Sequence, residues 1–132
     1  MKEDNWELNE DGTLIISYNG VIEPFFVYDD RMKKKIKSVY IKKGATEIGY
    51  AAFEDCEELE WVIIEDGLVK IDGKAFHSCS SLVYVKVPGS VKEIGPGAFD
   101  YCRGLCTVYI DNFKEAVNIC GWNTCEFVFL KK

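Results

Sequence analysis

The sequence lacks long hydrophobic runs, an excess of positive charge and, with one exception, histidine. None of its 132 residues lies in an apolar stretch near the roughly 18 residues that a membrane-spanning helix needs, so we expect no membrane insertion. The formal net charge is -6, whereas nucleic-acid binding requires a basic surface, so we expect no nucleic-acid partner. The single histidine, His77, leaves few side chains for a zinc centre.

Several motifs of catalysis and targeting are also missing. The sequence has no glycine-rich phosphate loop, no zinc-protease motif and no EF-hand spacing. Residues 1–6 are polar and acidic, so we do not expect them to form a signal peptide, and the compartment stays open. The short basic run from Arg31 to Lys37 is expected to be a solvated face beside the first repeat strand. We therefore expect no cofactor and no enzymatic activity.

What is present is a repeat: six apolar positions recur three times at an interval of 23 residues, without insertion or deletion. The copies are Ile48, Phe53, Cys56, Leu59, Val62 and Ile64; Ile71, Phe76, Cys79, Leu82, Val85 and Val87; and Ile94, Phe99, Cys102, Leu105, Val108 and Ile110. A fixed period between about 20 and 29 residues with this leucine-rich core is typical of a leucine-rich-repeat solenoid.

Each copy predicts one coil. The apolar residues at its end alternate with other residues, which indicates a half-buried strand, and stacked coils place these strands side by side in a parallel sheet. The preceding Ala-Phe-x-x-Cys-x-x-Leu segment has apolar residues three apart, which favours a short helical or 3₁₀ turn. We predict an α/β leucine-rich-repeat solenoid, a β-α superhelix of about four coils, in which each coil buries its apolar face against its neighbours.

The two ends are predicted to be caps of a single domain. An Asp11-Gly12 pair between alternating runs indicates a hairpin, so Trp6 to about Tyr28 is expected to cover the first coil. The predicted parts are a β cap at 1–35, repeats at 36–113 and a degenerate last repeat at 114–132.

Projection of the repeat extends it in both directions. Backward, it gives a strand with Ile36, Val39 and Ile41. Forward, it gives the core positions Val117, Trp122, Cys125 and Val128. Phe127 and Phe129 depart from the pattern and are expected to fold back as a cap, with the last strand cut short by Lys132.

These residues resemble the BspA-type leucine-rich repeat family, whose pattern reads Ile-Gly-x-x-Ala-Phe-x-x-Cys-x-x-Leu-x-x-Val-x-Ile-Pro. The core matches in full over Ile48 to Ile110 and in part over Ile36 to Val128. The resemblance implies a curved right-handed solenoid with a β-lined concave side. It also implies a role in adhesion: such modules resemble surface-exposed proteins of gut and oral microbes that engage host proteins, matrix or other cells.

Four of the six cysteines fall at the repeat interval: Cys56, Cys79, Cys102 and Cys125. The simplest interpretation is a row of buried thiols that pack as small apolar groups. Disulfides along the row are disfavoured, because side chains stacked in register point the same way. Cys106 and Cys120 lie outside the row, and a disulfide between them, or from Cys120 to the row, stays open.

The histidine does not indicate a catalytic site. His77 occupies the place of Glu54 and Asp100 in the other copies, which predicts an exposed turn. A set of Ser78, His77 and Asp72 can be drawn, but such a set can be drawn in any chain of this size and carries little weight.

Strand alternation predicts which residues face outward. Three rows result: Ser38, Trp61, Tyr84 and Thr107; Tyr40, Ile63, Lys86 and Tyr109; and Lys42, Glu65, Pro88 and Asp111. Contiguous exposed aromatic residues often mark a binding surface. Strands also favour aromatic residues without any binding role, and the same residues could pack on a cap or on another chain.

We therefore predict a non-catalytic interaction module that binds a protein or peptide through the concave sheet. The candidate ligand-binding residues are Trp61 and Tyr84 at the centre, with Tyr40, Ile63, Lys86 and Tyr109 around them. Two alternatives stay open. The same aromatic residues could bind a carbohydrate, or the chain could be a structural spacer that associates with itself through its open sheet edges.

Overall fold

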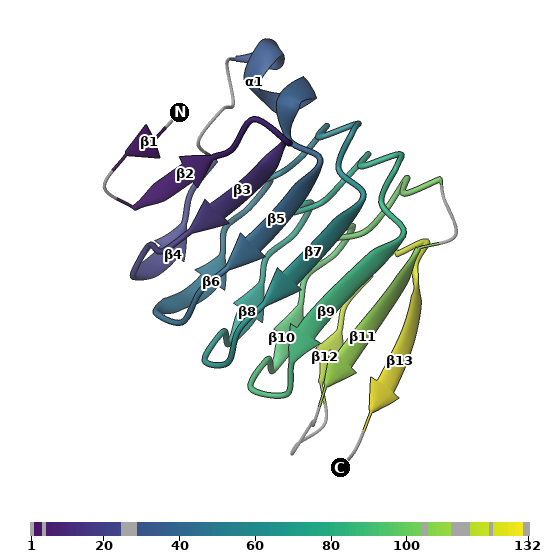
Figure 1. The fold of residues 1–132 in the computed structure, drawn as a ribbon. Helices are drawn as coiled ribbons and strands as arrows, with labels where there is room; N and C mark the ends of the chain where they lie inside the picture. The colour runs from purple at the N-terminus through teal and green to yellow at the C-terminus, as the bar shows by residue number, and fades with distance from the viewer. Residues whose placement is uncertain are drawn as a thin grey trace.

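The computed structural model describes residues 2–3, 5–24, 29–103, 106–111, 117–121 and 123–130, which form two sheets wound from successive coils (Figure 1). The eight-stranded sheet contains, in spatial order, β1 Lys2–Glu3, β2 Trp6–Leu8, β3 Thr13–Ile16, β5 Ser38–Ile41, β7 Trp61–Ile64, β9 Tyr84–Pro88, β11 Thr107–Asp111 and β13 Glu126–Leu130. The five-stranded sheet contains β4 Gly20–Ile22, β6 Ala45–Ile48, β8 Lys70–Ile71, β10 Glu93–Ile94 and β12 Asn118–Ile119. The coil therefore turns about five times, where four turns were expected.

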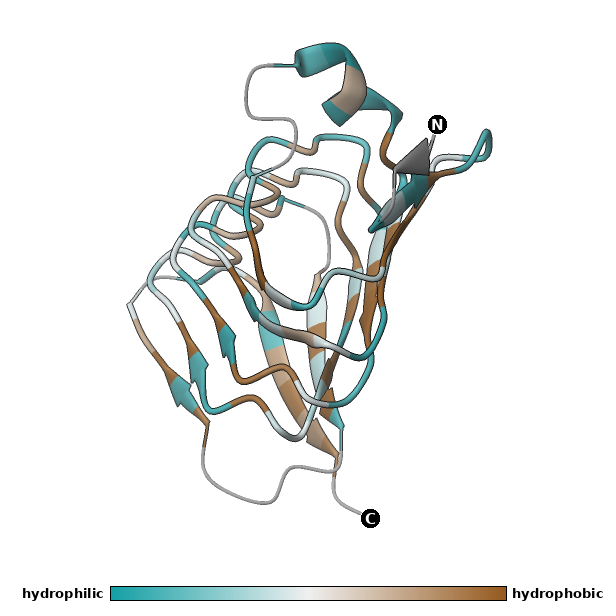
Figure 2. Cartoon of the chain, turned by 90° about the vertical axis from the view of Figure 1, so that its left-hand side faces the viewer, coloured by the Kyte–Doolittle hydropathy of each residue, from teal (hydrophilic) through white to brown (hydrophobic). Residues whose placement is uncertain are grey.

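The repeat strands of the large sheet pair in parallel at the predicted interval. Trp61 pairs with Ser38 on one side and with Tyr84 on the other, and Tyr84 pairs in turn with Thr107. The coils lie behind one another when viewed along the solenoid, and hydrophobic residues alternate with hydrophilic ones along their strands (Figure 2). The inward-facing residues of four strands are buried: Val39, Ile41, Val62, Ile64, Val85, Val87, Val108 and Ile110.

The smaller sheet was not predicted. Ile48, Ile71 and Ile94 pair side by side in it and are fully buried. From the sequence, this stretch was interpreted as the start of the return turn, because strands as short as β8 and β10 cannot show an alternating pattern.

The Ala-Phe-x-x-Cys-x-x-Leu segment forms turns, in line with the 3₁₀ alternative expected for it, so the coil is not the expected β-α superhelix. The Cys56 N–H donates to the Phe53 carbonyl three residues earlier, as in a 3₁₀ turn. Alternate N–H groups instead donate to the next coil: Phe53 to the Ala75 carbonyl at 2.7 Å, and Phe76 to the Ala98 carbonyl at 2.7 Å. A helix would need these donors for its own bonds, so the stacking of coils replaces it.

The expected N-terminal hairpin is present, and its second strand also begins the solenoid. β2 and β3 are antiparallel, with Trp6 opposite Ile16, while β3 pairs in parallel with β5 and β4 joins the smaller sheet. Residues 25–28 of the expected cap lie outside the described residues.

The one helix among the described residues is α1, Asp30–Lys35. The Asp29 side chain caps it by accepting hydrogen bonds from the N–H groups of Arg31 (3.1 Å) and Met32 (3.2 Å). Within the described ranges, no helix combines the length and apolar character that crossing a bilayer requires.

The last turn departs from the repeat interval. Ile94 pairs with Ile119 instead of with the predicted Val117, and Val108 pairs with Phe127. The return segment is shorter than in the other turns, so β13 begins early and is a complete strand rather than one cut short by the end of the sequence. Two predicted core positions lie outside the described residues: Leu105 and Trp122.

This register reverses the sides predicted for β13. Val128 pairs with Tyr109, so it lies on the outer side of the sheet and not in the core. Phe127 and Phe129 pair with Val108 and Ile110 and so take the inward side. The Phe127 ring meets the Phe99 ring edge-on with 6.0 Å between centroids, whereas Phe129 is 42% exposed. Phe127 thus closes the core as a cap, but it does so by continuing the sheet and not by folding back.

A column of phenylalanine rings runs through the centre of the core. The rings of Phe53 and Phe76 stack with centroids 5.2 Å apart, and those of Phe76 and Phe99 with centroids 5.3 Å apart. Both pairs are inclined by only 7°, and all three rings are buried. The predicted alignment of like residues over like is therefore confirmed.

Three thiols of the predicted cysteine row are buried beside this column. The Cys79 thiol donates to the Phe53 carbonyl at 3.2 Å, and the Cys102 thiol to the Phe76 carbonyl at 3.4 Å. Burial raises the pKa of the Cys56 and Cys102 thiols to about 12 and raises the pKa of the Cys79 thiol well above its usual range.

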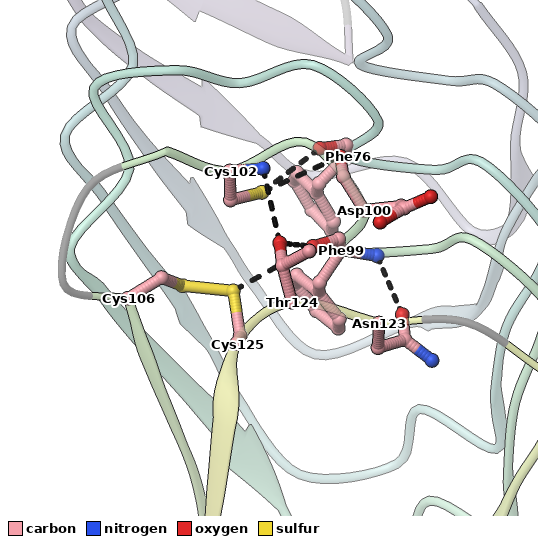
Figure 3. The surroundings of a disulfide bond; sticks show 8 residues. All are labelled: Phe76, Phe99, Asp100, Cys102, Cys106, Asn123, Thr124 and Cys125. Atoms are coloured by element: carbon pink, nitrogen blue, oxygen red, sulfur yellow. Dashed lines mark hydrogen bonds between the residues drawn. A yellow bond between two sulfur atoms is a disulfide. The ribbon is translucent and has the colours of Figure 1, made fainter.

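The fourth cysteine of the row, Cys125, forms a disulfide with Cys106, which corrects the prediction of a free thiol (Figure 3). β13 lies beside β11, and each cysteine immediately precedes its strand, so their Cα atoms come within 4.8 Å. Cys120 is a free thiol and partly exposed. The sequence did not reveal this disulfide, because Cys125 also fits the repeat interval.

Replacing the central phenylalanine should test the core column. We expect Phe76→Ala to lower the free energy of unfolding by about 3–5 kcal/mol, because it removes a ring packed on both faces and leaves a cavity. Urea unfolding followed by circular dichroism measures this. Tyr50→Ala is the control, since Tyr50 is 58% exposed, and should cost less than about 1 kcal/mol. Equal losses in the two variants would contradict the importance of the column.

Reduction of the disulfide should make the folded protein less stable. We expect a reducing agent to lower the free energy of unfolding by about 3 kcal/mol, because the cross-link restricts the unfolded chain. The Cys106→Ala variant should be less stable from the start and insensitive to reducing agent. A wild-type protein equally stable with and without reducing agent would show that the disulfide contributes nothing.

Alkaline pH should destabilise the protein through the buried thiols. The folded state holds the Cys56 and Cys102 protons up to a pKa of about 12, whereas an unfolded thiol loses its proton near 9.0. The contribution of these protonated thiols to the free energy of unfolding is therefore fully present below pH 9 and is lost as the pH rises toward 12. Urea unfolding across this range should show a shallower decline for Cys56→Ala with Cys102→Ala than for the control Cys120→Ala. Parallel declines would contradict this assignment.

Candidate functional site

The outer face of the large sheet brings together the six predicted site residues. We call this set the aromatic face: Tyr40, Trp61, Ile63, Tyr84, Lys86 and Tyr109. Strand pairing places Trp61 beside Tyr84 in one row and Ile63 beside Lys86 in the next. The rings of Tyr84 and Tyr109 lie in contact, with centroids 5.3 Å apart and an inclination of 39°. Tyr84 is 38% exposed and the other five residues are half-buried, so their outward orientation is confirmed.

A shallow hollow of about 210 Å³ opens at the edge of the aromatic face. Three residues of the face line it, together with charged side chains from the strand ends: Tyr40, Ile63 and Lys86, with Lys43, Glu65, Asp66 and Asp111. The hollow is smaller than the roughly 300–1,000 Å³ of most small-molecule sites, so it suits one side chain or one sugar ring.

The charged groups of this hollow are held in place by their neighbours. The Lys86 ammonium lies 3.7 Å from a carboxylate oxygen of Asp111. The backbone N–H of Lys43 donates to a carboxylate oxygen of Glu65 at 3.0 Å. A ligand here would meet oriented donors and acceptors beside an apolar surface, which is the usual composition of a recognition site.

The aromatic face is narrower than the predicted outward rows. Ser38 points outward but is only 5% exposed, because β3 lies beside β5 and the Ser38 hydroxyl donates to the Thr13 hydroxyl at 3.0 Å. The N-terminal hairpin therefore limits the accessible surface at the β5 end of the face. Pro88, from the third predicted row, is also buried.

The smaller sheet presents a different kind of surface. The Lys70 ammonium lies between the carboxylates of Glu47 (3.7 Å), Glu93 (3.3 Å) and Asp72 (3.9 Å). The hydrogen bond to Glu93, with the nearby carboxylate charges, raises the pKa of Lys70. These charges already pair with one another, so this surface is a weaker candidate for a ligand than the aromatic face.

His77 has partners, but they do not form a catalytic relay. The Ser78 hydroxyl (3.0 Å) and a Glu54 carboxylate oxygen (3.3 Å) both approach the same ring nitrogen, Nδ1. A relay needs the nucleophile and the carboxylate on opposite nitrogens of the ring. Asp72 does not join this group, since its carboxylate accepts a hydrogen bond from the Gly73 N–H at 2.7 Å. Among the described residues, no cluster of three or more histidine, cysteine or acidic side chains is arranged to hold a metal ion.

Similar solved structures share the repeat architecture. A leucine-rich repeat protein from Eubacterium ventriosum is 19% identical and matches with a TM-score of 0.61 over 89% of this chain and 38% of that protein. A leucine rich cell surface protein from Faecalibacterium prausnitzii is 20% identical, with a TM-score of 0.45 over 83% of this chain and 44% of that protein. A T. pallidum leucine rich repeat protein is 22% identical, with a TM-score of 0.43 over 95% of this chain and 82% of that protein.

These likenesses concern the fold, and only the first is close enough to support an argument. This chain spans 38% of the length of the Eubacterium ventriosum protein. Among curated proteins, no sequence matches significantly. The family described as BspA type Leucine rich repeat region matches residues 31–129 in 6 copies. The in-register coils, the column of stacked phenylalanines and this match together show that the chain belongs to the BspA-type leucine-rich repeat family.

Proposed function

We propose that this protein is a non-catalytic interaction module that binds a protein or peptide through the aromatic face. The observation that carries the proposal is the continuous, partly exposed aromatic surface made by Trp61, Tyr84 and Tyr109. Tryptophan and tyrosine supply large contact areas at a small entropic cost and dominate the binding energy of many interfaces. The sheet backbone beneath them is rigid, so little ordering is needed on binding.

The partner is proposed to be a host or cell-surface protein, with the module acting in adhesion. The Cys106–Cys125 disulfide supports an oxidising compartment, where such bonds persist. The arrangement around His77 counts against a catalytic relay there, because its two polar partners approach the same ring nitrogen.

Carbohydrate recognition is the second candidate. The hollow beside Tyr40 has the size of a single sugar ring, and the Lys86–Asp111 pair offers hydrogen-bonding groups next to aromatic surfaces. A glycan array distinguishes this candidate from peptide binding. Self-association through the sheet edge at β13 would appear as concentration-dependent growth in light scattering.

Replacing the two central aromatic residues should strongly weaken binding. Peptides selected from a random display library on the wild-type protein serve as probes. We expect Trp61→Ala with Tyr84→Ala to weaken their binding by at least about 30-fold, because the loss of even a single hot-spot residue costs about 2 kcal/mol or more. Biolayer interferometry measures the affinity, and circular dichroism shows whether the fold is intact.

The matched control is Tyr50→Ala with Tyr101→Ala, which removes two tyrosines from the turn surface. In the wild type these side chains are 58% and 55% exposed. The control should bind as the wild type does. Unchanged affinity in the Trp61 and Tyr84 variant, or an equal loss in the control, would remove the aromatic face as the site. Enrichment of no peptide together with a positive glycan array would favour carbohydrate instead.

A further inference from the structure

A second, larger hollow lies at the N-terminal end of the solenoid, away from the aromatic face. It has a volume of about 560 Å³ and opens between the turn that joins β2 to β3 and the C-terminal half of α1. The residues lining it are Leu8, Asn9, Glu10, Met32, Lys34, Lys35 and Lys37. This volume falls within the range of about 300–1,000 Å³ that ligand-binding pockets occupy.

The hollow has an apolar base. Leu8 and Met32 line it, and each is 6% exposed. Met32 is positioned by the cap of α1, where the Asp29 side chain accepts a hydrogen bond from the Met32 N–H at 3.2 Å. Two apolar side chains from separate segments thus line the same hollow.

The walls are fixed without a ligand. The Lys37 N–H donates to the Gly12 carbonyl at 2.8 Å, and the Gly12 N–H donates to the Asn9 carbonyl at 3.0 Å. Gly12 has a φ of +89°, and a Cβ there would lie 2.8 Å from the Lys35 carbonyl oxygen. The hairpin turn and the end of α1 are therefore packed directly against each other, which makes the hollow a preorganised feature.

The charge around the hollow is opposite to that of the whole chain. Three lysines and one glutamate line it, whereas the formal net charge of the protein is -6. Among the ion pairs of the described residues, none involves Lys34, Lys35 or Lys37. The neighbouring Asp11 carboxylate accepts hydrogen bonds from Thr13, which are the main cause of its lowered pKa. The positive charge of Lys37 lowers this pKa by a smaller amount.

We propose that this hollow binds a short acidic peptide segment, with carboxylates at the three lysines and one apolar side chain over Leu8 and Met32. Lysine ammonium groups are compact point charges that pair with carboxylates without the planar geometry that arginine imposes. The apolar base adds contact area that a purely ionic patch lacks.

A peptide fits better than a larger polyanion. Beyond the Debye length of about 8 Å at physiological salt, the lysines are screened, and an extended nucleic acid or anionic membrane would also face the acidic remainder of the surface. The site therefore favours a ligand that reaches little beyond the hollow itself.

The probe is a fluorescein-labelled nonapeptide of glutamates with one central leucine, measured by fluorescence anisotropy on the full chain. We expect Lys34→Gln with Lys37→Gln to weaken binding about tenfold at low salt, because two of three cations are lost. Lys74→Gln with Lys92→Gln is the control; these lysines are also exposed, lie on other turns and give the same change in net charge. Glu10→Gln should tighten binding about two- to threefold, because it removes the one carboxylate of the lining.

The remaining outcomes separate the alternatives. A peptide with central serine should bind more weakly, and amide shifts in nuclear magnetic resonance spectra should appear at Leu8 and Met32. Trp61→Ala with Tyr84→Ala should bind the probe normally, since that site is separate. The proposal is overturned if the probe fails to bind, if the control loses as much affinity, or if Glu10→Gln weakens binding. It is also overturned if only vesicles containing phosphatidylserine bind and Lys34→Gln with Lys37→Gln abolishes that binding.

Discussion

Hydrogen bonds between neighbouring coils complete the backbone of every turn, and the rest of the structure depends on them. In the turn segments alternate N–H donors point toward the following coil, as from Phe53 to the Ala75 carbonyl. Just before a repeat strand of the large sheet, the N–H donors point toward the preceding coil, as from Glu60 to the Lys37 carbonyl at 2.7 Å. A buried backbone group without a partner is costly, so each inner coil requires a neighbour on both sides at the same register. Columns of like side chains follow from this constraint.

The same close packing explains the glycines that start two of the return turns. A Cβ at Gly95 would lie 2.5 Å from the backbone nitrogen of Gly73, and one at Gly49 would lie 2.8 Å from the Ile22 carbonyl oxygen. These two positions leave no room for a side chain, whereas the equivalent position of the middle coil is Asp72 and its glycine follows at Gly73.

The ends of the solenoid replace the missing neighbours with other groups. At the C-terminal end, the Asn123 side-chain oxygen accepts from the Phe99 N–H at 2.8 Å, where the inner coils use a backbone carbonyl (Figure 3). The Thr124 hydroxyl accepts from the Cys102 N–H at 3.2 Å, whereas the corresponding N–H groups of Cys56 and Cys79 donate within their own coils. Side chains that stand in for backbone allow the last return segment to be shorter. The shorter segment in turn places Cys125 opposite Cys106.

The sequence by itself determined the repeated coils, the inward rows and the outward aromatic row, because a strict interval of 23 residues can be satisfied only by stacking in register. It also indicated the hairpin through Asp11-Gly12. The smaller sheet, the last strand and the disulfide were decided by tertiary structure. Strands as short as β8 leave no periodic signal, and the register of β13 depends on hydrogen bonds that the side chains of Asn123 and Thr124 accept and that no repeat interval encodes. The hollow beside α1 likewise arises only when the hairpin packs against the helix, since Leu8 and Met32 lie on separate segments that meet only in the folded chain.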